Sequence, residues 1–148
     1  GQTDVDGLYF MDDWGTQKST MFSIDTHREV ILPYVRKVVD AAHKEGCFIE
    51  MHSCGAVDPL FENFIEAGLD TWRGQASAIN KPALVEKYGD RFKFAVEIRP
   101  APNASAEEVR EMCKQFKKDY AGKNVWLAVS VLMPEHQLKV IQEEFYGK

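Results

Sequence analysis

The side chains best suited to chemistry stand at the end of the stretch CFIEMHSCG, where His52 and Cys54 are separated by one residue. The apolar residues before them are typical of a buried strand, and alternate side chains of a strand share a face. An imidazole nitrogen and a thiolate on one face are ligands that zinc takes. Cysteine is also a common core residue, so the pair fits a plain buried strand as well.

A catalytic zinc usually takes three protein ligands and keeps one open position, so a third ligand is needed. Glu97 ends a later expected strand and is the best-placed carboxylate, while His136 follows the last expected strand. Cys113 falls on the apolar stripe of an expected helix, and Cys47 stands at the wrong end of its strand. We therefore predict a metal site from His52, Cys54 and Glu97.

Other strand ends carry groups suited to binding and proton transfer. The first expected strand ends in MDDWGTQ, so Asp12 and Asp13 are candidates for catalytic acid and base, with Trp14 as a substrate contact. The alternative is an Asx-type turn with an exposed tryptophan. Arg73 and Arg99 also stand at strand ends, where each can hold a substrate carboxylate or simply face solvent.

The elements that must position these residues follow a regular order. Apolar spacing and turn residues predict a strand followed by a helix, five times over. Within the first helix, Pro33 predicts a kink or a break into two helices. Ser105 with Glu108 predicts a capping box at the fourth helix. The expected strands are 7–11, 47–52, 69–73, 92–98 and 125–133, and the helices are 23–46, 58–68, 80–89, 105–122 and a last one from 134.

Strict alternation of strand and helix predicts an α/β fold with a parallel sheet and right-handed crossovers. An open doubly wound sheet fits, and so does a partial TIM (β/α)8 barrel, whose complete form needs about 250 residues. Five units are too few to close eight strands. Both architectures place the active site beyond the carboxyl ends of the strands, where the candidate residues stand.

Composition limits the classes of partner. The chain has 148 residues, 45% of them hydrophobic and 28% charged, which predicts one globular domain over residues 1–148. A net charge of -5 without a basic patch argues against nucleic acid. No apolar run is long enough for a bilayer, and no signal peptide is visible. Three cysteines argue against a disulfide framework, so we expect the cytoplasm. A leading glycine in place of methionine suggests an excised piece of a longer protein.

The first half of the chain resembles the uroporphyrinogen decarboxylase (URO-D) superfamily. The resemblance rests on DDWG, on the S-x-x-x-x-R-x-x-x-x-P pattern of Ser23, Arg28 and Pro33, and on H-x-C-G followed by Asp58 and by the G-x-D of Gly68 and Asp70. It implies a (β/α)8 barrel of which this chain forms the C-terminal part, roughly strands four to eight. The members include the decarboxylase of porphyrin biosynthesis and corrinoid-dependent methyltransferases of the methylcobalamin:coenzyme M type.

The two branches imply different chemistry. The methyltransferase branch implies zinc held by His-x-Cys, here His52 and Cys54, and by a distant cysteine. That cysteine should stand near Val131, so Glu97 or His136 would have to replace it. The zinc-bound thiol then exchanges a methyl group with a corrinoid, which a corrinoid protein can carry. The decarboxylase branch implies tetrapyrrole decarboxylation without metal.

We favour the first branch and keep the second, together with a non-catalytic half-barrel that self-associates. The open edges of a half-barrel favour a homo-oligomer or pairing with the missing N-terminal half. Because the missing strands should carry part of the site, we expect this chain alone to have little or no activity.

Overall fold

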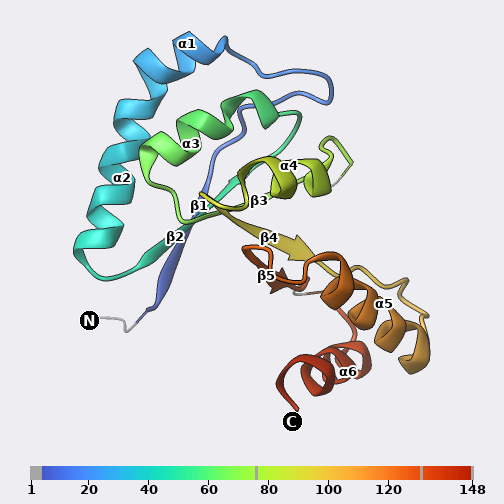
Figure 1. Cartoon of the computed structure of the whole chain (residues 1–148). Coiled ribbons are helices and arrows are strands. Elements are labelled where there is room, and N and C mark those ends of the chain that lie inside the picture. The colour runs from blue at the N-terminus through green and yellow to red at the C-terminus, as the bar shows by residue number, and fades with distance from the viewer. Residues whose placement is uncertain (1–4, 76, 131, 148) are drawn as a thin grey trace. The chain divides into compact units, whose positions relative to one another are not determined.

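The computed structural model describes residues 5–75, 77–130 and 132–147, and its described part holds five strands in one sheet (Figure 1). The strand order is β1-β2-β3-β4-β5, and the pairs β1–β2, β2–β3 and β3–β4 are parallel. Helices alternate with these strands, which confirms the predicted partial α/β barrel. The strands are β1 (Gly7–Met11), β2 (Phe48–Ser53), β3 (Thr71–Gly74), β4 (Lys93–Glu97) and β5 (Val125–Ala128).

The helices lie close to their predicted ranges. Two compact units are distinguished, with the boundary between Phe94 and Ala95, inside β4. The helical elements of the first unit are α1 (Ile24–Thr26), η1 (His27–Ile31), α2 (Leu32–Lys44), η2 (Asp58–Leu60), α3 (Phe61–Ala67) and α4 (Lys81–Tyr88). Those of the second unit are α5 (Ala106–Asp119) and α6 (Glu135–Tyr146).

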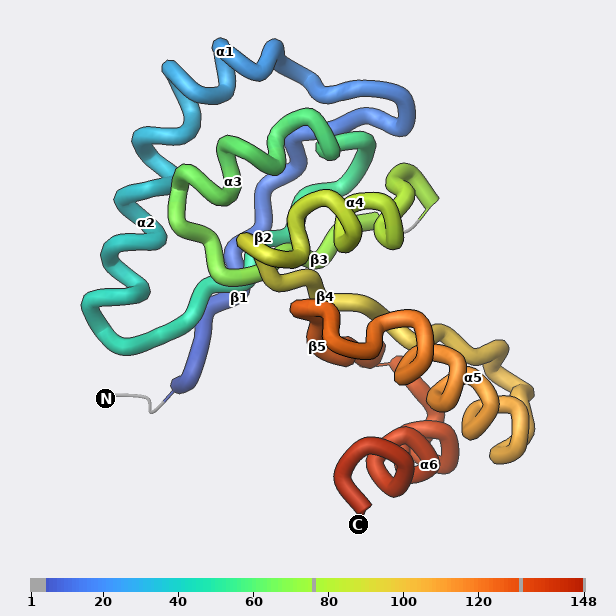
Figure 2. Tube along the Cα trace, in the orientation of Figure 1, coloured from blue at the N-terminus to red at the C-terminus, as the bar shows by residue number. Residues whose placement is uncertain are grey.

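The first helical segment runs from α1 through η1 into α2 without a break, as the tube in Figure 2 shows. Ser23 caps it as predicted, with its side chain accepting from the amide of Thr26 at 3.0 Å. The predicted disturbance at Pro33 takes the form of a π turn, in which the Leu32 amide bonds to the carbonyl of His27. Proline lacks the amide that an α-helix needs, and a wider turn just before it accommodates the loss.

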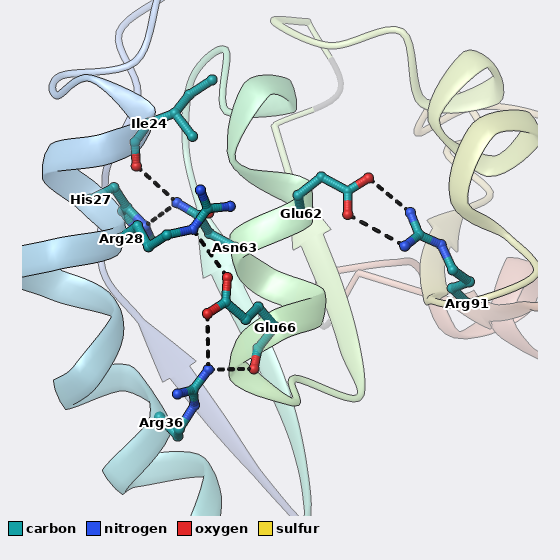
Figure 3. A network of polar contacts seen from close by, with 8 residues as sticks. All are labelled: Ile24, His27, Arg28, Arg36, Glu62, Asn63, Glu66 and Arg91. Carbon is teal, nitrogen blue, oxygen red and sulfur yellow. Dashed lines mark hydrogen bonds and ion pairs between the residues drawn. The ribbon is translucent and has the colours of Figure 1, made fainter.

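Helix α2 packs beside α3, and polar contacts join the two (Figure 3). Arg28 and Arg36 both reach Glu66, at 3.1 and 3.3 Å. These pairs are exposed, so each contributes at most about 1 kcal/mol. The buried amide of Asn63 donates to the Ile24 carbonyl and lies 3.1 Å from Nδ1 of His27. That contact ties the π turn to α3.

The two faces of the first unit's sheet differ in kind. Met51 and Trp72 point to the helix-covered face, where Phe61 of α3 meets the Trp72 ring at 5.0 Å between centroids. The opposite face is polar, because the register aligns Tyr9 with Glu50, and His52 with Arg73. This polar face ends at the loops after β1 and β2.

Strand β1 is an edge strand, and apolar side chains beside it are uncovered within the described chain. Met11 is 62% exposed, and Val30, Tyr34 and Val38 form a second apolar stripe on the first helical segment at helical spacing. An open strand edge and an apolar stripe are each surfaces suited to association. The expected self-association or pairing with further barrel strands remains a prediction.

The second unit has its own small core between α5 and α6. Val109 and Cys113 are fully buried there, together with Ile141 of α6. The predicted capping box of Ser105 and Glu108 is present. In the part of the chain that the structure covers, no helix is long and apolar enough to cross a membrane.

Candidate metal centre

The loops after β1 and β2 bring three potential ligands together. The amide of Asp12 donates to the His52 carbonyl at 3.1 Å, so the ladder continues just past β1. Beyond this point Asp13 faces His52 and Cys54, and one ligand atom from each lies within 4.8 Å of the others. Among the described residues this is the one such group of His, Cys, Asp or Glu ligands.

The distances within this group suit a small tetrahedral ion. Nε2 of His52 lies 3.2 Å from Sγ of Cys54 and 3.9 Å from Oδ1 of Asp13. Two ligands of a tetrahedral zinc ion, with bonds of about 2.0–2.3 Å, lie about 3.3–3.8 Å apart, so one separation here is slightly shorter than that range and the other slightly longer. One imidazole, one thiol and one carboxylate are also a donor set that zinc accepts. These three side chains are thus candidate zinc ligands, with Asp13 in the place where the sequence suggested Glu97.

The charges of the group favour a cation between its members. Burial raises the pKa of the Cys54 thiol, and the negative charge of Asp13 with its hydrogen bond raises that pKa further. Without a cation, the thiolate would face a carboxylate that repels it. A bound divalent ion reverses this relation, because it stabilises both anions at once.

The imidazole of His52 carries an unusual feature. Its Nδ1 atom is buried and has no hydrogen-bond partner among the described residues. Such an atom costs about 1–3 kcal/mol, and strained or unsatisfied groups of this kind gather at functional sites. The ring of Tyr9 lies 6.1 Å from that of His52 between centroids, so one side of the imidazole is shielded.

Two glycines allow the loops to approach this closely. Gly55 has φ +79°, as its expected role in a sharp turn requires. A Cβ at Gly55 would lie 2.3 Å from the carbonyl carbon of Gly15, and one at Gly15 would lie 2.7 Å from the Cys54 carbonyl oxygen. Backbone meets backbone here, so neither loop has room for a side chain.

The structure places Trp14 differently from the prediction of a substrate contact or an exposed turn residue. Its indole is 2% exposed and packs against His27 and Phe64, with centroids 4.7 and 5.7 Å away. The side chain is therefore part of the core, because the chain turns inward directly after Asp13. Asp12 is exposed beside the group but is not one of its three ligands.

The other predicted site residues are engaged in ion pairs. Arg73 lies beside His52 on the polar face and pairs with Glu50 at 2.8 Å. In the second unit, Glu97 pairs with Arg99. Glu97 is thus not part of the ligand group, and its role as a third ligand remains a prediction. Val131, where the resemblance expects a cysteine, lies outside the described residues.

Sequence reasoning missed Asp13 as a ligand, although a signal for it was present. Met11 pairs with His52 in the β1–β2 register, and Asp13 follows Met11 by the same step that takes His52 to Cys54. Knowing this register would have placed Asp13 opposite Cys54. Nothing in the sequence states the register directly.

Comparison with known proteins gives a likeness of fold. A methyltransferase from Methanosarcina mazei superposes with a TM-score of 0.64 at 15% sequence identity over 94% of this chain. The chain spans 41% of the length of that protein. No family model and no curated relative matches the sequence.

Proposed function

We propose that this chain is the metal-binding part of a zinc-thiol methyltransferase that moves a methyl group between a corrinoid and a thiol. The observation that carries the proposal is the meeting of Asp13, His52 and Cys54 at the carboxyl ends of two parallel strands. In barrels of this kind, that end of the strands carries the chemistry. The structural neighbour is a methyltransferase, which agrees with this choice.

In this proposal His52, Cys54 and Asp13 would hold the metal, which would then bind the substrate thiol. A bound zinc ion supplies Lewis acidity that ionises a coordinated thiol near neutral pH, and a thiolate is the nucleophile that S-methylation needs. The chain's own residues supply the ligand groups and hold them in position. Cys54 gives up its proton, and Asp13 stays oriented by accepting the Cys54 amide at 2.8 Å.

The wall of the site is the polar face of β1, β2 and β3. Tyr9 lies beside His52, and the guanidinium of Arg73 stacks 5.7 Å from the Tyr9 ring centroid. The Arg73–Glu50 pair leaves this wall with little net charge. The chain matches 41% of the neighbour's length, so we expect complete turnover to require further barrel strands.

Zinc content tests the proposal directly. We expect near-stoichiometric zinc by elemental analysis of the dialysed protein and loss of that zinc in His52→Ala and in Cys54→Ala. Cys113→Ala is the matched control, because it removes a thiol that lies in the core of the second unit. Absence of zinc from the unsubstituted protein, after supply of zinc during expression and refolding, would contradict the proposal.

A specific observation favours a second function, that of a self-associating half-barrel. Within the described chain the apolar stripe of Val30, Tyr34 and Val38 is exposed, and β1 is an open edge of the sheet. Light scattering across a range of concentrations tests this. A dimer that Tyr34→Glu dissociates, in a protein that binds no zinc, would favour the structural function over the catalytic one.

A further inference from the structure

We propose that Ser53 is a positioning residue of this metal centre, one that fixes Asp13 and Cys54 at their mutual distance without itself binding metal. The inference rests on the proposed zinc site. It assigns a role to the residue between the two ligands of the H-x-C pair, which points to the opposite side of the strand from both.

The Ser53 hydroxyl joins the two loops that carry the ligands. Its Oγ atom accepts the backbone amide of Trp14 at 3.0 Å and donates to the carbonyl of Cys54 at 3.2 Å. The serine is fully buried. One hydroxyl therefore connects the residue that follows Asp13 to Cys54 itself.

Asp13 needs this support because little else holds it. Its side chain is 56% exposed, and its Oδ1 atom accepts the Cys54 amide. The next residue, Trp14, is anchored at its ring by His27 and at its amide by Ser53. These two anchors restrict the backbone next to Asp13, so the carboxylate would lose less entropy on binding a metal.

Further contacts hold the same two loops at a fixed separation. The amide of Ala56 donates to the Thr16 carbonyl at 2.8 Å, and Gly15 and Gly55 touch through their backbones. These contacts lie beyond the ligands, whereas the Ser53 bonds lie beside them. Ser53 is therefore the group whose loss reaches the ligands first.

The test is a zinc and cobalt titration of four proteins: the unsubstituted chain, Ser53→Ala, Asp13→Asn and the double variant. We expect Ser53→Ala to weaken zinc binding about 10- to 100-fold, as loss of an outer-shell partner does. The cobalt-loaded protein should also change its visible spectrum toward a higher coordination number. In the Asp13→Asn background, the same serine substitution should change affinity less than threefold, because the ligand that it positions is already lost.

Thr71→Val is the matched control. Thr71 is a fully buried β-strand residue whose hydroxyl has no hydrogen-bond partner in the described chain, so valine replaces it without loss of a bond. We expect its zinc affinity to equal that of the unsubstituted protein. If Ser53→Ala does not fold by circular dichroism, Ser53→Cys keeps a side chain of similar size that forms only weak hydrogen bonds, and it should weaken zinc binding in its place.

The outcomes separate the two proposals. No zinc in the unsubstituted protein would contradict the zinc site and this inference with it. Normal zinc affinity in Ser53→Ala would contradict the inference alone. If Ser53→Ala lowered zinc affinity by the same factor with and without the Asp13 carboxylate, the inference would also be overturned. Ser53 would then act on folding rather than through Asp13.

Discussion

Cys54 and Cys113 are both cysteines, but their surroundings differ. Cys54 ends a strand beside His52 and Asp13, and part of its surface is open. Cys113 sits mid-helix in α5, fully buried among apolar side chains of the second unit. Burial raises the pKa of both thiols, yet a ligand group surrounds only the first. The polar neighbours, rather than the thiol itself, therefore make Cys54 and not Cys113 the candidate metal ligand.

The largest expected effect comes from exchanging the thiol of Cys54 for a hydroxyl. Cys54→Ser should weaken zinc binding more than about 100-fold, because serine is a poor ligand for this ion. Its free energy of unfolding without metal should change by less than about 0.5 kcal/mol, as at other partly exposed positions. Competition with a chromophoric chelator and urea denaturation measure the two quantities. If Cys54→Ser bound zinc as tightly as the unsubstituted protein, the proposed difference between Cys54 and Cys113 would be wrong.

The reverse pattern is expected for Cys113→Ser. A hydroxyl buried among Val109, Phe116 and Ile141 gives up its hydrogen bonds to water in an apolar environment. This costs about 1–3 kcal/mol. Zinc affinity should stay as in the unsubstituted protein. Urea denaturation of the apo and zinc-loaded protein checks both expectations. A loss of zinc in this variant would contradict the claim that Cys113 takes no part in zinc binding.

Asp13→Asn should have an intermediate effect and tests whether a charge belongs in the first region. The amide keeps the size of the side chain and can still accept the Cys54 amide, but it lacks the charge that balances the ion. We expect zinc to bind about 100-fold more weakly, at least as weakly as in Ser53→Ala, because a charged ligand is lost rather than repositioned. Glu97→Gln is the control, and a greater loss there would restore Glu97 as the third ligand.

A smaller effect should appear in the pH dependence of stability. The unfolded Cys113 thiol ionises near its ordinary pKa, whereas burial, with a contribution from the charge of Glu144, keeps the folded thiol protonated to higher pH. The folded state then binds more protons, so the free energy of unfolding should fall as pH rises above about 9. Cys113→Ala should lessen this fall in urea denaturation series. An unchanged slope would mean that the thiol is not held neutral in the core.

The weakest effect should occur at low pH. Burial lowers the pKa of His27, so the folded protein holds this imidazole neutral. As pH falls below about 6.5, the unfolded chain takes up a proton first, and stability should decrease. His27→Gln should show a smaller decrease in the same urea series. If His27→Gln lost as much stability at low pH as the unsubstituted protein, groups other than His27 would be responsible for the decrease.

The alternation of strands and helices could be predicted because period and turn residues are local signals. The capping box at Ser105 and the cap at Ser23 are of this kind. The fifth strand was predicted too long: apolar residues continue to Met133, but the strand ends at Ala128. Hydrophobicity alone does not show where pairing with a neighbouring strand stops.

The candidate site was predictable in part. The His52–Cys54 pair follows from a period of two, which is a property of one strand. The choice of Asp13 over Glu97 depends on the register between strands, and the burial of Trp14 depends on where His27 lies. Both are properties of pairs of segments far apart in the chain, and one sequence does not display them.

The π turn at His27–Ile31 holds one residue more than an α-helix would use for the same rise. That extra residue rotates the side chains of the preceding helical turns by about 100° around the helix axis relative to α2, because one residue of an α-helix corresponds to about 100°. Deleting one residue from the turn would restore a regular helix and swing His27 away from Trp14. The loop carrying Asp13 would lose the contact beneath it, so a change in helical phase far from the ligands would loosen them.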